Sequence, residues 1–92
     1  MTVMPSTRIH IPSPLYSYTG GAALVEARGS TLAALLDALE TRYPGLRFRI
    51  VDEQNRIREH IRFFVDGELA RELSQSVTPG HEVHILCALS GG

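Results

Sequence analysis

The feature that most constrains this chain is a leucine-rich segment in the middle of a sequence otherwise made of short apolar runs. Its apolar residues recur every three or four positions and therefore share one face of an α-helix. They are Leu32, Leu35, Leu36, Leu39 and Tyr43. Thr31 suits the N-cap, because its hydroxyl can accept a hydrogen bond from a free backbone N–H of the first turn. Pro44-Gly45 ends the helix. The pattern predicts one amphipathic helix, which needs a partner layer to bury its apolar face.

Alternating and β-branched segments on both sides of the helix predict strands. The expected strands cover residues 8–11, 23–27, 61–65, 68–71 and 83–89. Asp66-Gly67 is typical of a type I′ hairpin turn, in which both central residues have positive φ. Gly20-Gly21 and Thr78-Pro79-Gly80 predict two further turns. Residues 46–59 are expected to form an irregular or short helical connection.

The order of these elements, β-β-α-β-β-β, is that of the β-grasp, or ubiquitin-like, fold. We therefore predict an α+β chain with a mixed sheet of four to five strands covered by one main helix. The first and last strands should be parallel neighbours, with the third beside the last, and Leu46 and Ile50 tucked under the sheet. The predicted inward residues are Ile9, Ile11, Leu24, Leu32, Leu35, Leu36, Leu39, Ile61, Phe63, Val65, Val83 and Ile85.

Length and composition narrow the class of protein. Ninety-two residues predict a single domain over 1–92, with a flexible C-terminal Gly-Gly tail over about 88–92. A net charge of −1 gives no electrostatic case for nucleic acid or anionic membranes. The first residues lack the pattern of a secretory signal, and no apolar run reaches the roughly 18 residues of a membrane span. A lone Cys87 excludes an internal disulfide, so we expect a cytoplasmic protein.

Three motifs in succession carry a resemblance to a known family. They are GSTLAALLDALETRYPG, FFVDGE and TPGHEVHILCALSGG. In order and spacing they resemble the ThiS/MoaD family of small ubiquitin-like sulfur carriers. The segment IPSPLYSYTGG is similar to the CysO-like branch of that family. Cys87 stands where the family often has proline, and Ser90 where it often has alanine or valine.

The resemblance implies that the terminal carboxylate of Gly92 is the reactive group. An E1-like adenylyltransferase (ThiF/MoeB-like) would adenylate it with ATP and Mg, and a sulfurtransferase would supply sulfur to form a thiocarboxylate. A sulfur-accepting synthase would then receive that sulfur. The chain would thus be a protein cosubstrate and not an enzyme, would bind no cofactor or metal itself, and would be a monomer when free.

The resemblance leaves the sulfur acceptor open. Biosynthesis of cysteine or of a sulfur-containing metabolite is favoured over a role as the small subunit of molybdopterin synthase (MoaD-like). A ubiquitin-like protein modifier or interaction module is an alternative of a different class.

The tail itself has properties that suit such chemistry. Gly91 and Gly92 lack a Cβ, so they can enter a narrow channel and leave the carbonyl carbon open to attack. Residues 89–92 can reach roughly 13 Å when extended, at about 3.3 Å per residue. We therefore expect Leu89, Ser90 and Gly91 to bind the partner's channel and Gly92 to react there.

The predicted strands also expose a candidate docking face. With Ile61, Phe63 and Val65 pointing inward, Arg62 and Phe64 face outward together with Leu86 of the last strand. Exposed apolar residues that lie together on a sheet favour a protein-binding patch over ordinary surface scatter.

Two other residue types invite functional readings. His10, His60 and His84 can share the open face, but a metal site needs converging ligands, so solvated surface histidines are favoured. Cys87 is more consistent with a partly buried packing residue than with a transfer thiol.

Overall fold

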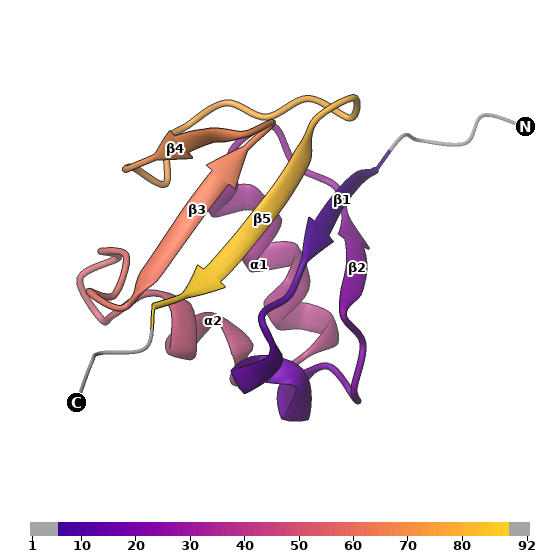
Figure 1. Cartoon of the computed structure of the whole chain (residues 1–92), viewed down its shortest axis with the longest axis vertical. Helices are drawn as coiled ribbons and strands as arrows, with labels where there is room; N and C mark the ends of the chain where they lie inside the picture. The colour runs from indigo at the N-terminus through magenta and orange to yellow at the C-terminus, as the bar shows by residue number, and fades with distance from the viewer. Residues whose placement is uncertain (1–5, 89–92) are drawn as a thin grey trace, which may run out of the picture.

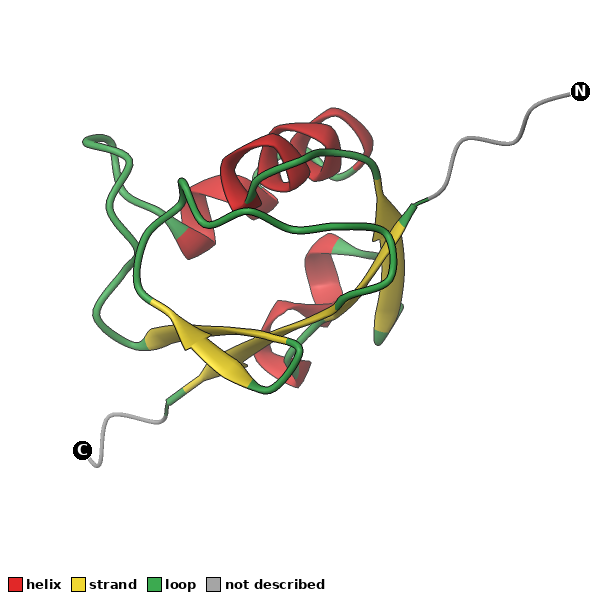
Figure 2. Ribbon diagram, turned by 90° about the horizontal axis from the view of Figure 1, so that it is seen from above, coloured by secondary structure: helices red, strands yellow, loops and turns green. Residues whose placement is uncertain are grey.

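The structure, a computed structural model, describes residues 6–88. These residues form one mixed five-stranded sheet with α1 packed against one face (Figures 1 and 2). The elements are β1 (Thr7–His10), η1 (Ser13–Tyr18), β2 (Leu24–Ala27), α1 (Leu32–Arg42), α2 (Leu46–Ile50), β3 (Ile61–Val65), β4 (Glu68–Ala70) and β5 (Glu82–Cys87).

The sheet has the strand order β2-β1-β5-β3-β4. β1 and β5 are parallel neighbours, and β3 lies antiparallel beside β5. Both relationships were predicted, and the β-grasp fold is confirmed. The β3–β4 hairpin also turns as expected, since φ is 54° at Asp66 and 87° at Gly67.

The core lies between α1 and the inner face of the sheet. All the predicted inward residues are buried except one, and Leu46 and Ile50 of α2 are buried as expected. The exception is Leu24, which is 40% exposed. β1 and β2 pair with Ile9 opposite Val25 and His10 opposite Leu24, so Val25 faces inward and Leu24 faces solvent. Because AALVEA is nearly continuous in apolar residues, its alternation could not determine which side faces the core.

The segment between β1 and β2 contributes a buried side chain to the core. It forms the 3₁₀ helix η1, which begins after Pro12 and buries Leu15. Val51, Ala70 and Val77 are further buried residues that were not among the predicted set. Three of these four residues lie outside the regular strands and α1, where periodicity gives no signal.

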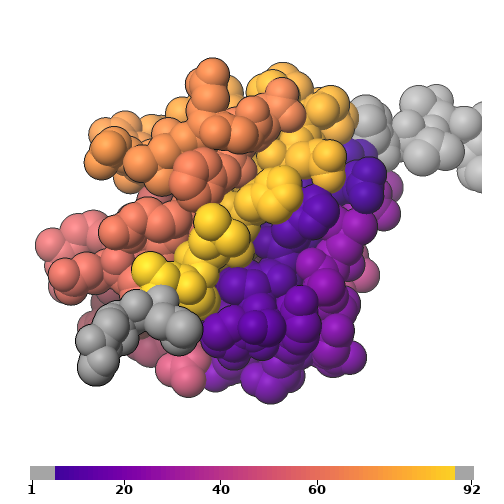
Figure 3. Space-filling model, viewed as in Figure 1, coloured from indigo at the N-terminus to yellow at the C-terminus, as the bar shows by residue number. Residues whose placement is uncertain are grey.

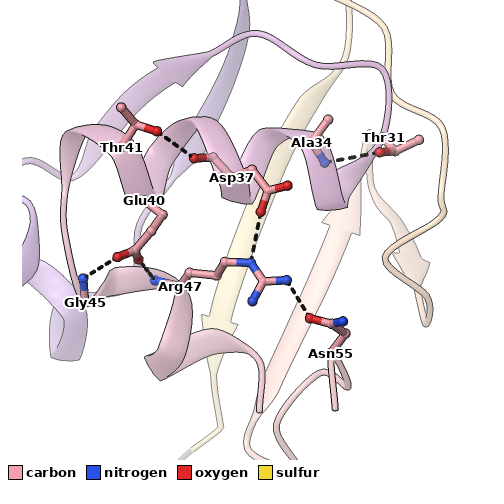
Figure 4. A network of polar contacts seen from close by, with 8 residues as sticks. All are labelled: Thr31, Ala34, Asp37, Glu40, Thr41, Gly45, Arg47 and Asn55. Atoms are coloured by element: carbon pink, nitrogen blue, oxygen red, sulfur yellow. Dashed lines mark hydrogen bonds and ion pairs between the residues drawn. The ribbon is translucent and has the colours of Figure 1, made fainter. Parts of the chain in front are cut away.

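The ends of α1 are defined by side-chain contacts that also hold α2 (Figure 4). The Thr31 hydroxyl accepts a hydrogen bond from the N–H of Ala34 at 3.2 Å, which confirms the predicted N-cap. Near the other end, the Glu40 carboxylate accepts from the N–H groups of Gly45 and Arg47, at 2.8 and 2.9 Å. These two backbone hydrogen bonds lower the pKa of Glu40. The start of α2 is thereby tied to α1.

Arg47 adds a second connection in the same region. Its Nε donates to Asp37 of α1 at 3.1 Å, and its Nη2 donates to Asn55 at 2.7 Å (Figure 4). α2 is thus fixed to α1 on one side and to the loop before β3 on the other. Within residues 6–88, none of the helices is long and apolar enough to cross a membrane.

Candidate functional site

The candidate site is the end of β5, where the chain leaves the sheet. Cys87 pairs with Ile61 of β3, and the Ala88 N–H donates to the His60 carbonyl at 2.7 Å. The sheet therefore holds the chain as far as Ala88. The predicted tail residues Leu89, Ser90, Gly91 and Gly92 lie outside the described residues, so their roles stay predictions.

A row of side chains crosses the face of the sheet turned away from α1. The strand registers place Leu24 opposite His10, His10 opposite His84, His84 opposite Phe64, and Phe64 opposite Leu69. The row therefore runs over all five strands, with apolar residues at its ends and two imidazoles at its centre. Figure 3 shows this face, with β5 in yellow between β1 and β3.

The predicted docking residues lie on this face. Arg62 pairs directly with Leu86, and Phe64 is two residues further along β3 on the same face, diagonal to Leu86. Diagonal neighbours on a sheet are within reach of an aromatic side chain. Leu86 is 47% exposed, and Phe64 is half-buried. Their expected proximity is confirmed, and their part in partner binding stays a prediction.

Two of the three predicted surface histidines are brought together. The rings of His10 and His84 stack in parallel, with centroids 4.0 Å apart. His10 Nε2 lies 2.8 Å from Glu82 Oε1, and the Arg8 Nε is 4.0 Å from the same oxygen. The hydrogen bond from His10, followed by the charges of Arg8 and the two histidines, lowers the pKa of Glu82.

This arrangement does not resemble a metal centre. Stacked rings place their nitrogens side by side and not toward a common point. The third histidine, His60, lies apart from the pair, in a groove at the end of β5. Among residues 6–88, no group of three histidine, cysteine or acidic side chains could hold a metal ion.

The groove that contains His60 was not anticipated from the sequence. It has a volume of about 850 Å³ and is bounded by η1, α2, the loop before β3, and the ends of β3 and β5. Its basic residues are Arg49, Arg58, His60 and Arg62. The only signal in the sequence was the recurrence of arginine through residues 47–62, because the walls come from segments that are distant along the chain.

Cys87 forms part of the groove wall and packs against the core cluster. Burial raises the pKa of its thiol, so the nucleophilic thiolate is scarce at neutral pH. This environment supports a packing role and not that of a transfer thiol.

Comparison with known proteins agrees with this geometry. The model of the ThiS family matches residues 9–92. The sulfur carrier protein CysO of Mycobacterium tuberculosis is 33% identical over 89 residues, which cover 91% of this chain and 96% of the relative.

Solved structures show the same likeness. CysO from a BexX/CysO complex of Amycolatopsis orientalis matches with a TM-score of 0.87 and 34% identity, over 94% of this chain and 99% of that one. M. tuberculosis CysO gives a TM-score of 0.85 and 31% identity, over 90% and 99% of the two chains. SAMP1 of Haloferax volcanii gives a TM-score of 0.79 and 26% identity, over 95% and 99%. The chain is thus a homologue of CysO and belongs to the ThiS family.

Proposed function

We propose that this chain is a sulfur carrier that cycles Gly92 between a carboxylate and a thiocarboxylate. The observation that carries this proposal is the family match, which extends through residue 92 and so includes the terminal Gly91-Gly92. Its homology to proteins named as sulfur carriers supports the same role. As a carrier, the chain is a cosubstrate of partner enzymes and needs no catalytic side chain of its own.

The chemistry begins with activation of a poor electrophile. An E1-like adenylyltransferase transfers AMP from ATP to the Gly92 carboxylate and releases pyrophosphate, using its own Mg²⁺. Sulfide then attacks the acyl carbon and displaces AMP, which forms the C–S bond of the thiocarboxylate. A synthase finally takes the sulfur, and water restores the carboxylate.

The described part of the chain would position the tail for these reactions. β5 pairs with β1 over Glu82–His84 and with β3 as far as Cys87, so the end of the strand that leads to Gly92 is held by β3. Arg62, Phe64 and Leu86 offer a surface on which a partner can dock while the tail enters its active site. A CysO structure determined together with BexX supports the expectation that such carriers form partner complexes.

For the acceptor, we favour a synthase that makes cysteine or a sulfur-containing metabolite, because the matching curated relatives are CysO proteins. A molybdopterin synthase partner is the alternative within the same chemistry.

A ubiquitin-like protein modifier is the second candidate function. It is supported by the likeness to SAMP1, a small archaeal modifier protein. In that role Gly92 would form an isopeptide bond with a lysine of a target protein. This chain contains no lysine, so it could not extend chains of itself through its own side chains.

Intact mass spectrometry of the protein purified from its native cells tests both functions. If the chain is a carrier, a thiocarboxylate form should be present. It should be heavier than the carboxylate form by the mass difference between sulfur and oxygen, and it should react with an alkylating agent. Deletion of Gly92 should abolish that species. High-mass adducts that leave a Gly-Gly remnant on target lysines would favour the modifier role. Sulfur delivery by the chain lacking Gly92 would exclude the carrier mechanism.

A further inference from the structure

Three arginines from separate segments meet where the chain leaves the sheet. Arg49 comes from α2, Arg58 from the loop before β3, and Arg62 from β3 itself. All three line the groove that also contains Cys87 and Ala88. Any protein that takes up the tail must therefore pass close to these guanidinium groups.

Each arginine contacts a backbone carbonyl or an aromatic ring, and these contacts leave its charge unneutralised. The Arg58 Nε donates to the carbonyl of Phe48 at 2.7 Å, and its guanidinium lies 4.6 Å above the ring of the same residue. The guanidinium of Arg49 lies 5.5 Å from the ring centre of Tyr18. Arg62 donates to two backbone carbonyls, at 2.6 and 2.9 Å. Carbonyls and aromatic rings orient a guanidinium but carry no net negative charge.

In the described part of the chain, half of the six arginines outside the groove pair with a carboxylate, whereas Arg28, Arg42 and Arg71 do not. Between residues 6 and 88, the arginines that pair with carboxylates are Arg8, Arg47 and Arg56. The groove arginines take part in no ion pair there, although Glu59 lies in the same wall. Three positive charges against one negative charge leave a local excess on a chain whose overall net charge is −1.

We propose that this groove docks an acidic segment of the adenylating enzyme that activates Gly92. Guanidinium groups that are already oriented lose less freedom when they bind carboxylates. The remaining walls include Pro14 and Leu15, which suit the apolar side chains of a peptide segment. The inference rests on the proposed carrier function, since it identifies the chemistry of that partner.

Kinetics with the E1-like enzyme of the same organism test the proposal. We expect the double variant Arg49→Gln/Arg58→Gln to raise KM for this chain roughly tenfold at low salt, with kcat little changed. The difference should shrink at about 0.5 M NaCl, where exposed charges are screened. Arg28→Gln is the matched control for the single variant Arg58→Gln, because Arg28 follows β2 at the opposite end of the sheet from Cys87.

Two further variants separate charge from folding. Arg58→Lys keeps the positive charge, so its KM should stay close to that of the wild type. Arg58→Gln removes the charge and should raise the KM. Circular dichroism of each variant verifies that it is folded. Unchanged KM in the folded double variant would overturn the docking proposal, and a rise for Arg28→Gln equal to that for Arg58→Gln would do the same.

A direct binding experiment removes the dependence on catalysis. Titration of the ¹⁵N-labelled chain with hexaglutamate should shift the amides of residues 58–62 and 87–88 in the wild type and in the chain lacking Gly92. Shifts elsewhere, no shifts, or equally tight binding of a single-stranded RNA of the same charge would overturn the proposal. Absence of a thiocarboxylate despite the predicted hexaglutamate shifts would instead count against the carrier function alone.

Discussion

His10 and His84 lie face to face on neighbouring parallel strands, with ring planes within 1° of each other. The stack follows from the parallel register of β1 and β5, which places the two residues side by side. It forms the centre of the row that crosses the open face. Glu82, two residues earlier on β5, accepts a hydrogen bond from His10 and joins the pair to the charged neighbour Arg8.

The first prediction concerns the acid stability of this cluster. The pKa of Glu82 is lowered, chiefly by the hydrogen bond from His10 and then by the charges of Arg8, His10 and His84. A carboxylate whose pKa is lower in the folded state stabilises the fold above its unfolded pKa, and this stabilisation is lost as the pH falls through the folded value. Glu82→Gln should therefore lose less stability than the wild type between about pH 6 and pH 3.

Urea unfolding at a series of pH values measures this difference. Glu53→Gln, which changes an exposed carboxylate in the loop before β3, serves as the control. If Glu82→Gln shows the same pH dependence as the wild type, the contact between His10 and Glu82 does not contribute to stability in solution.

The second prediction concerns the docking face. Leu86→Asp places a charge where an exposed leucine lies opposite Arg62. We expect at least a tenfold loss of affinity for the adenylating enzyme, about 1.4 kcal/mol, with stability within about 0.5 kcal/mol of the wild type. Isothermal titration calorimetry and thermal unfolding give the two quantities.

Leu24→Asp is the matched control, since Leu24 has similar exposure on the same face but lies on the edge strand β2. It should weaken binding less than Leu86→Asp. If Leu24→Asp lost as much affinity for the adenylating enzyme as Leu86→Asp, or more, the enzyme would not bind chiefly at the end of β5.

The third prediction concerns Cys87. Burial raises the pKa of this thiol, so the carboxylate form of the protein should react with a thiol reagent at neutral pH more slowly than free glutathione does. Cys87→Ala should still form the thiocarboxylate at a rate close to that of the wild type. Absorbance of the released chromophore and intact mass follow the two reactions. If a folded Cys87→Ala variant no longer formed the thiocarboxylate, Cys87 would take part in sulfur transfer despite its burial.

The fourth prediction concerns a close approach between the end of β2 and α1. A Cβ on Gly29 would lie 2.8 Å from the Ala34 Cβ and 2.9 Å from the Leu35 N, so either the helix or the loop would have to move. Gly29→Ala should lower the free energy of unfolding by about 1–3 kcal/mol. Gly80→Ala is the control, because its Cβ would meet nothing within 4 Å. Equal stability of the two variants in urea unfolding would contradict the close packing.

Local sequence patterns determined most of the architecture. The leucine spacing with Thr31 predicted α1, and Asp66-Gly67 predicted the β3–β4 hairpin. These features depend on residues within a few positions of one another, where sterics and hydrogen bonding leave few conformations. The family resemblance came from three short motifs in order along the chain, the last of which ends in Gly91-Gly92.

Tertiary structure decided which of these residues meet. The β1–β2 register turned Leu24 outward, and the parallel β1–β5 register stacked His10 on His84. The basic groove needed α2 and the start of β3 to converge beside Ala88. Strand register and the meeting of distant segments depend on burial summed over the whole core, which no short stretch of sequence contains.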